Sequence, residues 1–143
     1  MLAYIDTSAV VPLFLIEAHT PAMQAWVTGE GPRVILGDFT AAEFAAAVSR
    51  SLRMGHLTTS EAEAVLADFD LWRSHLEQRY TGRDDIASCE RLVRDLQLKL
   101  NAPDALHLAI AMADDLPIVT FDERLAAAAR SLKHRVVVPG SKG

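Results

Sequence analysis

The segment "MLAYIDTSAVVPLFLIE", residues 1–17, joins a short apolar run to a helical pattern through a single carboxylate, Asp6. "MLAYI" is apolar throughout and too short for a stable helix, which predicts a strand covered on both faces. "SAVVPLFLIE" predicts a helix with Pro12 in its first turns, where proline is tolerated. A buried strand followed by a helix is the repeating unit of α/β folds.

The same unit recurs along the chain. Further strands are predicted at 33–37, 117–121 and 135–138, with a weaker strand at 76–80. Helical patterns occupy 20–29, 40–55, 58–76, 84–100, 101–111 and 123–132. Alternating strands and helices favour parallel pairing through crossovers. The sequence therefore predicts an α/β fold: a three-layer α/β/α sandwich around a central, mostly parallel sheet of four to five strands.

The size and composition indicate one domain. The chain has 143 residues, of which 50% are hydrophobic and 23% charged, values typical of a folded core and not of disorder. We expect a single domain over 1–138 and a short C-terminal tail at 139–143. The only cysteine, Cys89, excludes an internal disulfide and favours a reducing compartment. The apolar stretch 7–16 is too short to span a membrane and lacks a preceding basic region, so a cytoplasmic location is expected.

Four acidic residues stand out by position. Asp6 and Asp122 directly follow predicted strands, whereas Glu43 and Asp104 lie in the first turns of predicted helices. The carboxyl ends of parallel strands and the amino ends of the following helices meet at one edge of a sheet, where ligands bind in such folds. The four carboxylates are therefore expected to line one cleft, although the placement of Asp104 is the least direct.

Each acid also has a local structural explanation. Glu43 completes a capping box with Thr40, and Asp104 lies where a helix dipole favours negative charge, with Asn101 as the cap. Asp6 and Asp122 are suited to cap the helices that follow them. Taken singly, capping is the better explanation for Glu43 and Asp122, and the two explanations are balanced for the other two acids.

Taken together, the four acids favour chemistry. Carboxylates sharing a cleft repel one another and raise one another's pKa unless a cation compensates. Oxygen ligands without a thiolate or histidine cluster select Mg²⁺ or Mn²⁺. Such an ion activates water and bridges phosphate oxygens, which is the chemistry of a phosphodiester hydrolase. Ser8 and Thr120, two residues from strand-ending acids, are candidates to orient carboxylates or waters, whereas His107 is more often a packed or supporting imidazole than a ligand.

Four motifs carry a resemblance to a known family. "YIDTSAVVPLF", "TAAEFAAAVSR", "NAPDALHLAIA" and "VTFDERL", in this order and spacing, together resemble the PIN-domain family, and most closely its VapC-type toxin branch. The resemblance extends from Leu2 to about Val138. It implies a Mg²⁺- or Mn²⁺-dependent endoribonuclease that cuts RNA with metal-activated water, a homodimer, and an inhibitory VapB-like antitoxin whose C-terminal segment occupies the active-site groove.

The resemblance also assigns residues. Asp6, Glu43, Asp104 and Asp122 match the family's catalytic, metal-binding acidic quartet, with Asp6 and Asp104 as the expected direct metal ligands. Ser8 and Thr120 match positions where the family often carries hydroxyls.

The negative net charge of −5 is the wrong sign for an ordinary nucleic-acid binder. Apart from the four site acids, however, 15 acidic and 14 basic residues remain, so the rest of the chain is nearly neutral. Arg50 and Arg53, on the predicted helix that carries Glu43, are candidate phosphate contacts.

Three other functions remain open. The first is a PIN-like RNA-processing nuclease outside a toxin–antitoxin pair. The second is a non-catalytic PIN module that binds RNA or a partner. The third, phosphoryl transfer through an aspartyl intermediate, is disfavoured because position 8 is a serine where that chemistry needs a second aspartate. The sequence does not define the RNA target, the number of metal ions or the identity of the antitoxin.

Overall fold

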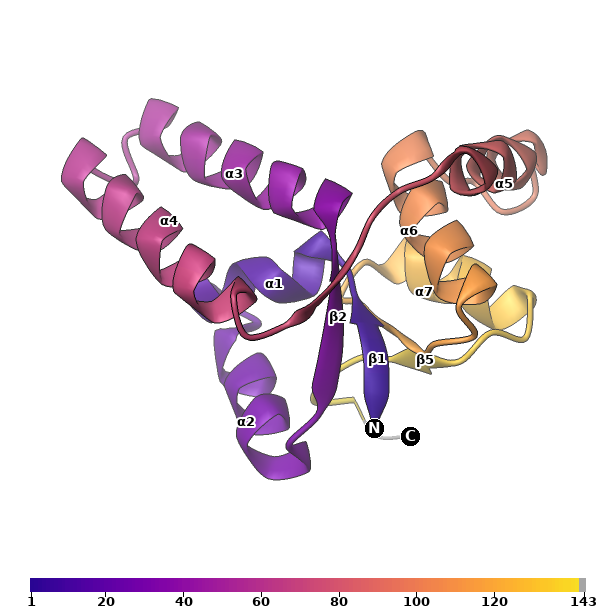
Figure 1. Cartoon of the computed structure of the whole chain (residues 1–143), viewed down its shortest axis with the longest axis horizontal. Coiled ribbons are helices and arrows are strands. Elements are labelled where there is room, and N and C mark those ends of the chain that lie inside the picture. The colour runs from indigo at the N-terminus through magenta and orange to yellow at the C-terminus, as the bar shows by residue number, and fades with distance from the viewer. Residues whose placement is uncertain (142–143) are drawn as a thin grey trace.

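A five-stranded parallel sheet forms the centre of the protein (Figure 1). The structure is a computed structural model, and it describes residues 1–141. The strand order is β3-β2-β1-β4-β5. The strands are β1 (Leu2–Ile5), β2 (Arg33–Gly37), β3 (Glu77–Arg79), β4 (Ile118–Val119) and β5 (Val136–Val137). The predicted parallel α/β sheet is confirmed; residues 142–143 of the predicted tail lie outside the described residues.

Helices cover both faces of the sheet, because each parallel strand is reached through a helical crossover. The helices are α1 (Thr7–Phe14), α2 (Thr20–Glu30), α3 (Asp38–Arg53), α4 (Thr59–Arg73), α5 (Arg83–Arg94), α6 (Ala102–Ala113) and α7 (Glu123–Ser131). In Figure 1, α1 to α4 lie on one side of the sheet and α5 to α7 on the other. None of the helices described in residues 1–141 has the length and apolarity needed to cross a membrane.

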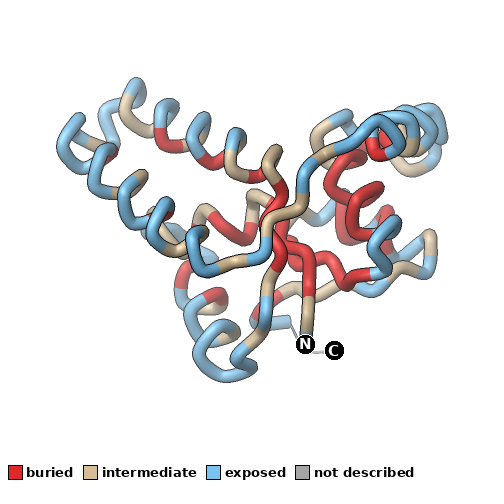
Figure 2. Tube along the Cα trace, viewed as in Figure 1, coloured by how far each residue is buried: buried red, intermediate tan, exposed pale blue. Residues whose placement is uncertain are grey.

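The central strand β1 divides the core into two clusters. Tyr4 packs with residues of α5, α6 and α7, whereas Ala3 and Ile5 pack with residues of α1 to α4. This follows from the alternation of side chains along a strand. Figure 2 shows buried residues concentrated along the sheet and α6, and exposed residues along the outer sides of α3 and α4.

Four aromatic rings attach the α3–α4 hairpin to α1. The Phe14 ring centroid lies 5.4 Å from Phe44, 5.7 Å from Phe69 and 5.4 Å from Trp72, in each case edge to face. Phe44 and Phe69 stack at 4.2 Å. Such contacts hold the two long helices of the hairpin to the body of the protein, and they place the first turns of α3 beside the end of β1.

Helix α3 begins earlier than the sequence predicts. Its cap is Gly37, and its first turn contains Asp38, so Thr40 lies inside the helix and is fully buried. The reason is tertiary: the Asp38 carboxylate accepts hydrogen bonds from the backbone N–H of Phe39 at 2.8 Å and from Thr81 Oγ1 at 2.7 Å. The predicted capping box between Thr40 and Glu43 is therefore wrong, and the local explanation for Glu43 disappears with it.

Candidate active site

Asp6 lies at the carboxyl end of the central strand and is held by two hydroxyls. It follows β1, caps α1 and is 2% exposed. Ser8 Oγ donates to its Oδ1 at 2.7 Å, and Thr120 Oγ1 donates to its Oδ2 at 2.7 Å. Burial raises the pKa of Asp6, and the nearby His107 and the two hydroxyls offset only part of this rise. The structure thus fixes the position of a carboxylate whose charge is costly.

The same hydroxyls join the ends of β1 and β4. Ser8 Oγ lies 3.1 Å from Thr120 Oγ1 and accepts a hydrogen bond from the Phe121 backbone N–H at 2.9 Å. The backbone N–H of Asp122 donates to Thr120 Oγ1 at 3.0 Å. Asp122 also caps α7 by accepting from the Leu125 N–H at 2.8 Å. Asp122 is therefore placed at the same sheet edge as Asp6, and its capping role is real as well.

Glu43, one turn into α3, takes its partners from outside its own helix. Its Oε1 accepts from Thr7 Oγ1 at 2.6 Å and lies 2.5 Å from His107 Nε2. Burial alone would raise its pKa, but the hydrogen bonds from His107 and Thr7 outweigh burial and lower the pKa. Glu43 is therefore held as a charged carboxylate between α1 and α6, a placement that helix capping does not require.

His107 is buried beneath this carboxylate. Its side chain is 2% exposed, and its Nδ1 lies 2.8 Å from the hydroxyl of Tyr4. Burial is the main cause that raises the pKa of Tyr4, so the phenol keeps its proton at neutral pH. His107 thus bridges a strand residue and a site acid, and its position fits a supporting role better than a direct ligand.

Asp104 shows that the four acids share one electrostatic environment. It lies in the first turn of α6, where Asn101 Oδ1 accepts from its backbone N–H at 2.9 Å. Its pKa is raised to about 6, first by burial and then by the negative charges of Asp122 and Asp6, with Glu43 contributing in the same direction. The structure therefore brings all four predicted acids to one edge of the sheet.

The acids fit a hard divalent cation by their donor chemistry. All four supply carboxylate oxygens, each with two lone pairs, and Mg²⁺ and Mn²⁺ prefer such oxygens. A cation would also relieve the repulsion that raises the pKa of Asp104. Within residues 1–141, no group of three or more His, Cys, Asp and Glu side chains forms a ready-made metal cage. The fit is one of charge and donor type.

The predicted phosphate contacts lie in a groove that Glu43 also lines. Glu43, Arg50 and Arg53 line the same cavity of about 560 Å³, together with Thr7 and other residues of α1 and α3. Both arginines are exposed, and Arg53 Nη1 donates to Ser49 Oγ at 2.7 Å. Positive charge therefore extends along α3 away from Glu43.

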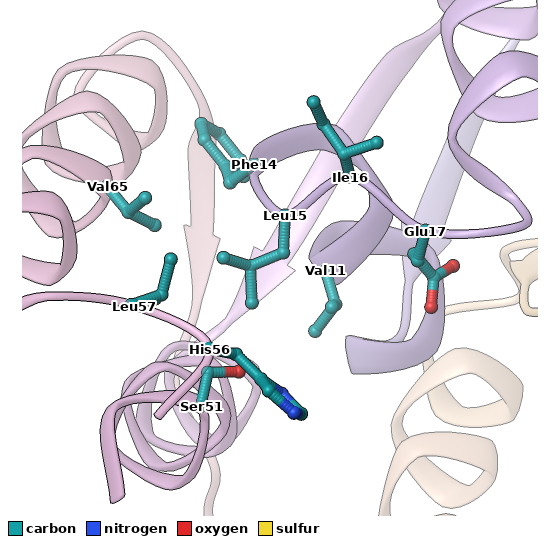
Figure 3. Close-up of a pocket in the computed structure, with 9 residues that line it drawn as sticks. All are labelled: Val11, Phe14, Leu15, Ile16, Glu17, Ser51, His56, Leu57 and Val65. Atoms are coloured by element: carbon teal, nitrogen blue, oxygen red, sulfur yellow. The ribbon is translucent and has the colours of Figure 1, made fainter. Parts of the chain in front are cut away.

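A second groove continues from the first. It has a volume of about 550 Å³ and lies between the end of α1 and the α3–α4 hairpin (Figure 3). Val11, Leu15 and Ser51 line both grooves. The lining of this second groove is mostly apolar, and Ile16 at its edge is 96% exposed. The two grooves together form a path from the acids to an exposed apolar surface.

Two residues of the site were not predicted from the sequence. Thr7 donates to Glu43, and Tyr4 contacts His107. Thr7 directly follows the strand-ending Asp6, so the pattern of a hydroxyl after a strand-ending acid was available to find it. Tyr4 lies inside an apolar strand and carries no such pattern, because a buried tyrosine is ordinarily a core residue.

A protein-family sequence model and several solved structures match this chain. The PIN domain sequence model matches residues 3–131. VapC20 of Mycobacterium tuberculosis, described as a sarcin-ricin loop cleaving toxin, has a similar structure, with TM-score 0.71 and 19% identity over 90% of this chain and 95% of that chain. A toxin–antitoxin complex from Klebsiella pneumoniae gives TM-score 0.70 and 17% identity, covering 98% and 99% of the two chains.

A third similar structure is FitAcB from Neisseria gonorrhoeae, with TM-score 0.68 and 18% identity over 97% of this chain and 98% of that chain. No curated protein matches this chain in sequence. At these identities the structural neighbours establish the fold, and the sequence model establishes the family.

Proposed function

Because this chain belongs to the PIN domain family, we propose that it is a metal-dependent endoribonuclease acting as the toxin of a VapBC-type toxin–antitoxin pair. The nuclease unit is the single domain over residues 1–138. The observation that carries the proposal is the shared edge at which Asp6, Glu43, Asp104 and Asp122 meet, with the pKa of Asp104 raised by its neighbours.

The residues have separate tasks in this proposal. Asp6 and Asp104 are the direct ligands of Mg²⁺ or Mn²⁺, and Asp122 and Glu43 complete the catalytic set. A divalent ion held there supplies positive charge and Lewis acidity for phosphodiester hydrolysis. Ser8 and Thr120 fix the orientation of Asp6 through 2.7 Å hydrogen bonds. Preorganised carboxylates avoid reorganisation when substrate binds, which is the usual source of such catalysis.

RNA enters along the groove that leads away from Glu43. Arg50 and Arg53 line this groove and supply the contacts to phosphates that the net charge of −5 otherwise disfavours. Both arginines are exposed and lie further along α3 than Glu43, where they can contact phosphates of the RNA backbone. Base recognition is expected to come from other groove contacts.

The test is RNA cleavage by purified protein with Mg²⁺ or Mn²⁺. Wild type should cleave structured or single-stranded RNA, and chelation of the metal, Asp6→Asn or Asp104→Asn should abolish cleavage. Asp84→Asn is a matched control, because Asp84 is also an aspartate in a first helical turn but is exposed. Cleavage that survives both site substitutions would come from a contaminating nuclease and would overturn the proposal.

Calorimetric titration with Mn²⁺ separates binding from catalysis. Binding at millimolar metal or below with no cleavage of any RNA would favour a non-catalytic RNA-binding or partner-binding module. A protein that neither binds Mn²⁺ nor cleaves RNA would not be a metal-dependent nuclease. Induced expression of wild type against Asp6→Asn, scored for growth arrest and RNA fragments, distinguishes a toxin from an RNA-processing nuclease.

The proposed partner is a VapB-like antitoxin. Similar structures support it, since they include a toxin–antitoxin complex and a VapBC assembly. An antitoxin segment of apolar and acidic residues fits the joined grooves, where the apolar surface of Figure 3 leads to Arg50. Ile16→Asp should weaken complex formation with the product of the adjacent reading frame at least tenfold, whereas Leu71→Asp, exposed on α4, should not. Equal effects would place the antitoxin elsewhere.

We also propose a homodimer in the cytoplasm. Sedimentation of the purified chain tests the first: a mass of 15.6 kDa at all concentrations would exclude the dimer. Fractionation of cells that express the protein tests the second.

A further inference from the structure

Two buried side chains, Tyr4 of β1 and His107 of α6, form a hydrogen-bonded network with the site acid Glu43. Tyr4 Oη lies 2.8 Å from His107 Nδ1, and His107 Nε2 lies 2.5 Å from Glu43 Oε1. Tyr4 is fully buried and His107 is 2% exposed, whereas the Glu43 side chain is 27% exposed. The contacts therefore run from the core of the protein outward to a carboxylate at the surface of the cleft.

Gly37 makes room for the first member of this network. A Cβ built on Gly37 would lie 2.7 Å from Tyr4 Oη, closer than real Cβ contacts, and 3.4 Å from two atoms of the Tyr4 ring. The backbone of Gly37 is extended, with φ −77° and ψ 148°, which any residue adopts. The glycine is thus needed for the space that the tyrosine hydroxyl occupies, and not for its own backbone conformation.

For a neutral imidazole, one arrangement of protons pairs every group in this network. Glu43 Oε1 is in contact with Thr7 Oγ1 at 2.6 Å as well as with His107 Nε2, so this oxygen acts as an acceptor from both. His107 then carries its proton on Nε2, which leaves Nδ1 as an acceptor. The Tyr4 hydroxyl is the donor that Nδ1 requires, since its other hydrogen-bonding partner within residues 1–141, Thr40 Oγ1, is 3.5 Å away.

Packing explains the position of the imidazole but not its contacts. The rings of Tyr4 and Phe39 lie 5.8 Å and 5.7 Å from the His107 ring, and any ring of this size would make these contacts. An apolar side chain could fill the same space without the two hydrogen bonds that a buried imidazole requires, and here those bonds join a core phenol to a site acid. Partners at both nitrogens fix the tautomer and orientation of a histidine.

We propose that Gly37, Tyr4 and His107 are positioning residues: Gly37 and Tyr4 hold His107 in its Nε2–H tautomer, and the Nε2–H group orients the Glu43 carboxylate in the acid site. Tyr4 and His107 are buried, and they act on the acid site through Glu43. Their effect on RNA cleavage rests on the proposed function, but the tautomer and its influence on Glu43 do not. The tautomer is measurable in the metal-free protein, and its influence on Glu43 is measured by Mn²⁺ binding in the absence of RNA.

The first experiment measures the tautomer by NMR of protein with ¹⁵N-labelled histidine. The His107 signals are assigned by their loss in His107→Gln. In metal-free wild type at neutral pH, Nε2 should carry the proton and Nδ1 should not. Tyr4→Phe and Gly37→Ala should both produce a mixture of the two tautomers. The matched controls are Tyr80→Phe, which removes the exposed second tyrosine hydroxyl, and Gly29→Ala, where an added Cβ meets nothing within 4 Å.

Wild type with the proton on Nδ1, or on both nitrogens, would overturn the proposal. So would an unchanged tautomer in Tyr4→Phe and Gly37→Ala with folding retained, as judged by circular dichroism. If one of the two variants does not fold, the other still decides, because they disturb the same hydroxyl from opposite sides.

The second experiment measures Mn²⁺ affinity by calorimetry in the absence of RNA. Tyr4→Phe and Gly37→Ala should weaken binding about tenfold, and His107→Leu between about tenfold and a hundredfold, because partners of metal-binding groups have effects of this size. His107→Gln should recover part of the loss, since its amide donates to Glu43. Unchanged affinity in His107→Leu would overturn the proposal. A protein that shows the tautomer effects but cleaves no RNA would contradict the proposed function alone.

Discussion

Replacing Asp104 by asparagine is expected to stabilise the metal-free protein. The pKa of Asp104 in the folded protein is raised from 3.8 to about 6 by burial and by the charges of Asp122 and Asp6. A carboxyl group whose folded pKa exceeds its unfolded pKa binds protons more tightly when folded, so its ionisation opposes folding. Removing that charge therefore removes a cost, although it also removes a proposed metal ligand.

The magnitude follows from the same shift. A rise from 3.8 to about 6 corresponds to about 3 kcal/mol. The side chain is only half-buried, and solvent screening reduces this to about 1.5 kcal/mol. Asparagine also loses the favourable interaction of a charge with the first turn of α6, about 0.5 kcal/mol. The expected net gain is about 1 kcal/mol, or a rise in Tm of about 3 °C for a chain of this size.

The gain should depend on pH in a defined direction. Below about pH 4 Asp104 is protonated in both states and costs nothing; the cost develops between about pH 4 and pH 6 and is complete above that range. Thermal unfolding in EDTA at about pH 4.5 and about pH 7.5 tests this, with Asp84→Asn as the control, which should be neutral or slightly destabilised. The electrostatic argument would be refuted if Asp104→Asn were no more stable than wild type at the higher pH, or if the variant were stabilised equally at the two pH values.

Three further predictions concern stability and reactivity away from the acids. Asp85→Asn should lower the free energy of unfolding, measured in urea, by about 2–3 kcal/mol, whereas Asp70→Asn, in an exposed ion pair, should lower it by less than about 1 kcal/mol. Because the hydrogen bonds from Arg79 lower the pKa of Asp85, wild type should lose this contribution as the pH falls below about 4. Phe44→Ala, in the aromatic cluster of Phe14, Phe44, Phe69 and Trp72, should lower the free energy of unfolding by about 3–5 kcal/mol, whereas Leu71→Ala, at a residue that is 67% exposed, should change it by less than about 0.5 kcal/mol. Burial raises the pKa of the Cys89 thiol, and the residue is 8% exposed. A thiol reagent should therefore react with the native protein at least about tenfold more slowly than with protein unfolded in guanidinium, and equal rates would contradict the burial of Cys89.

Elements with a clear hydrophobic pattern could be predicted from the sequence. The apolar runs at 2–5 and 33–37 became β1 and β2, and the helical pattern predicted from residue 58 became α4, which Thr58 caps. Boundaries set by distant contacts could not be predicted. Helix α3 starts at Asp38 because Thr81, 43 residues further on, holds its carboxylate. Local capping preferences contain no information about such a partner.

Part of the candidate site could likewise be predicted from the sequence, and part could not. The four acids were found because parallel topology brings strand ends and helix starts to one edge, so their sequence positions alone implied proximity. The groups that orient them depend on side-chain contacts between separate elements. Tyr4 was missed because a phenol in an apolar strand is indistinguishable from core until His107 is seen beside it.

The order of the strands also sets when the site is completed during synthesis. Asp6 is translated before Thr120, which holds its Oδ2 and is 114 residues further along. At about 5–20 residues per second, roughly 6–23 s of translation separate the two residues on the ribosome. A nascent chain therefore carries its first acid without the strand that fixes it, and no truncated product that ends before β4 can assemble the carboxylate cluster.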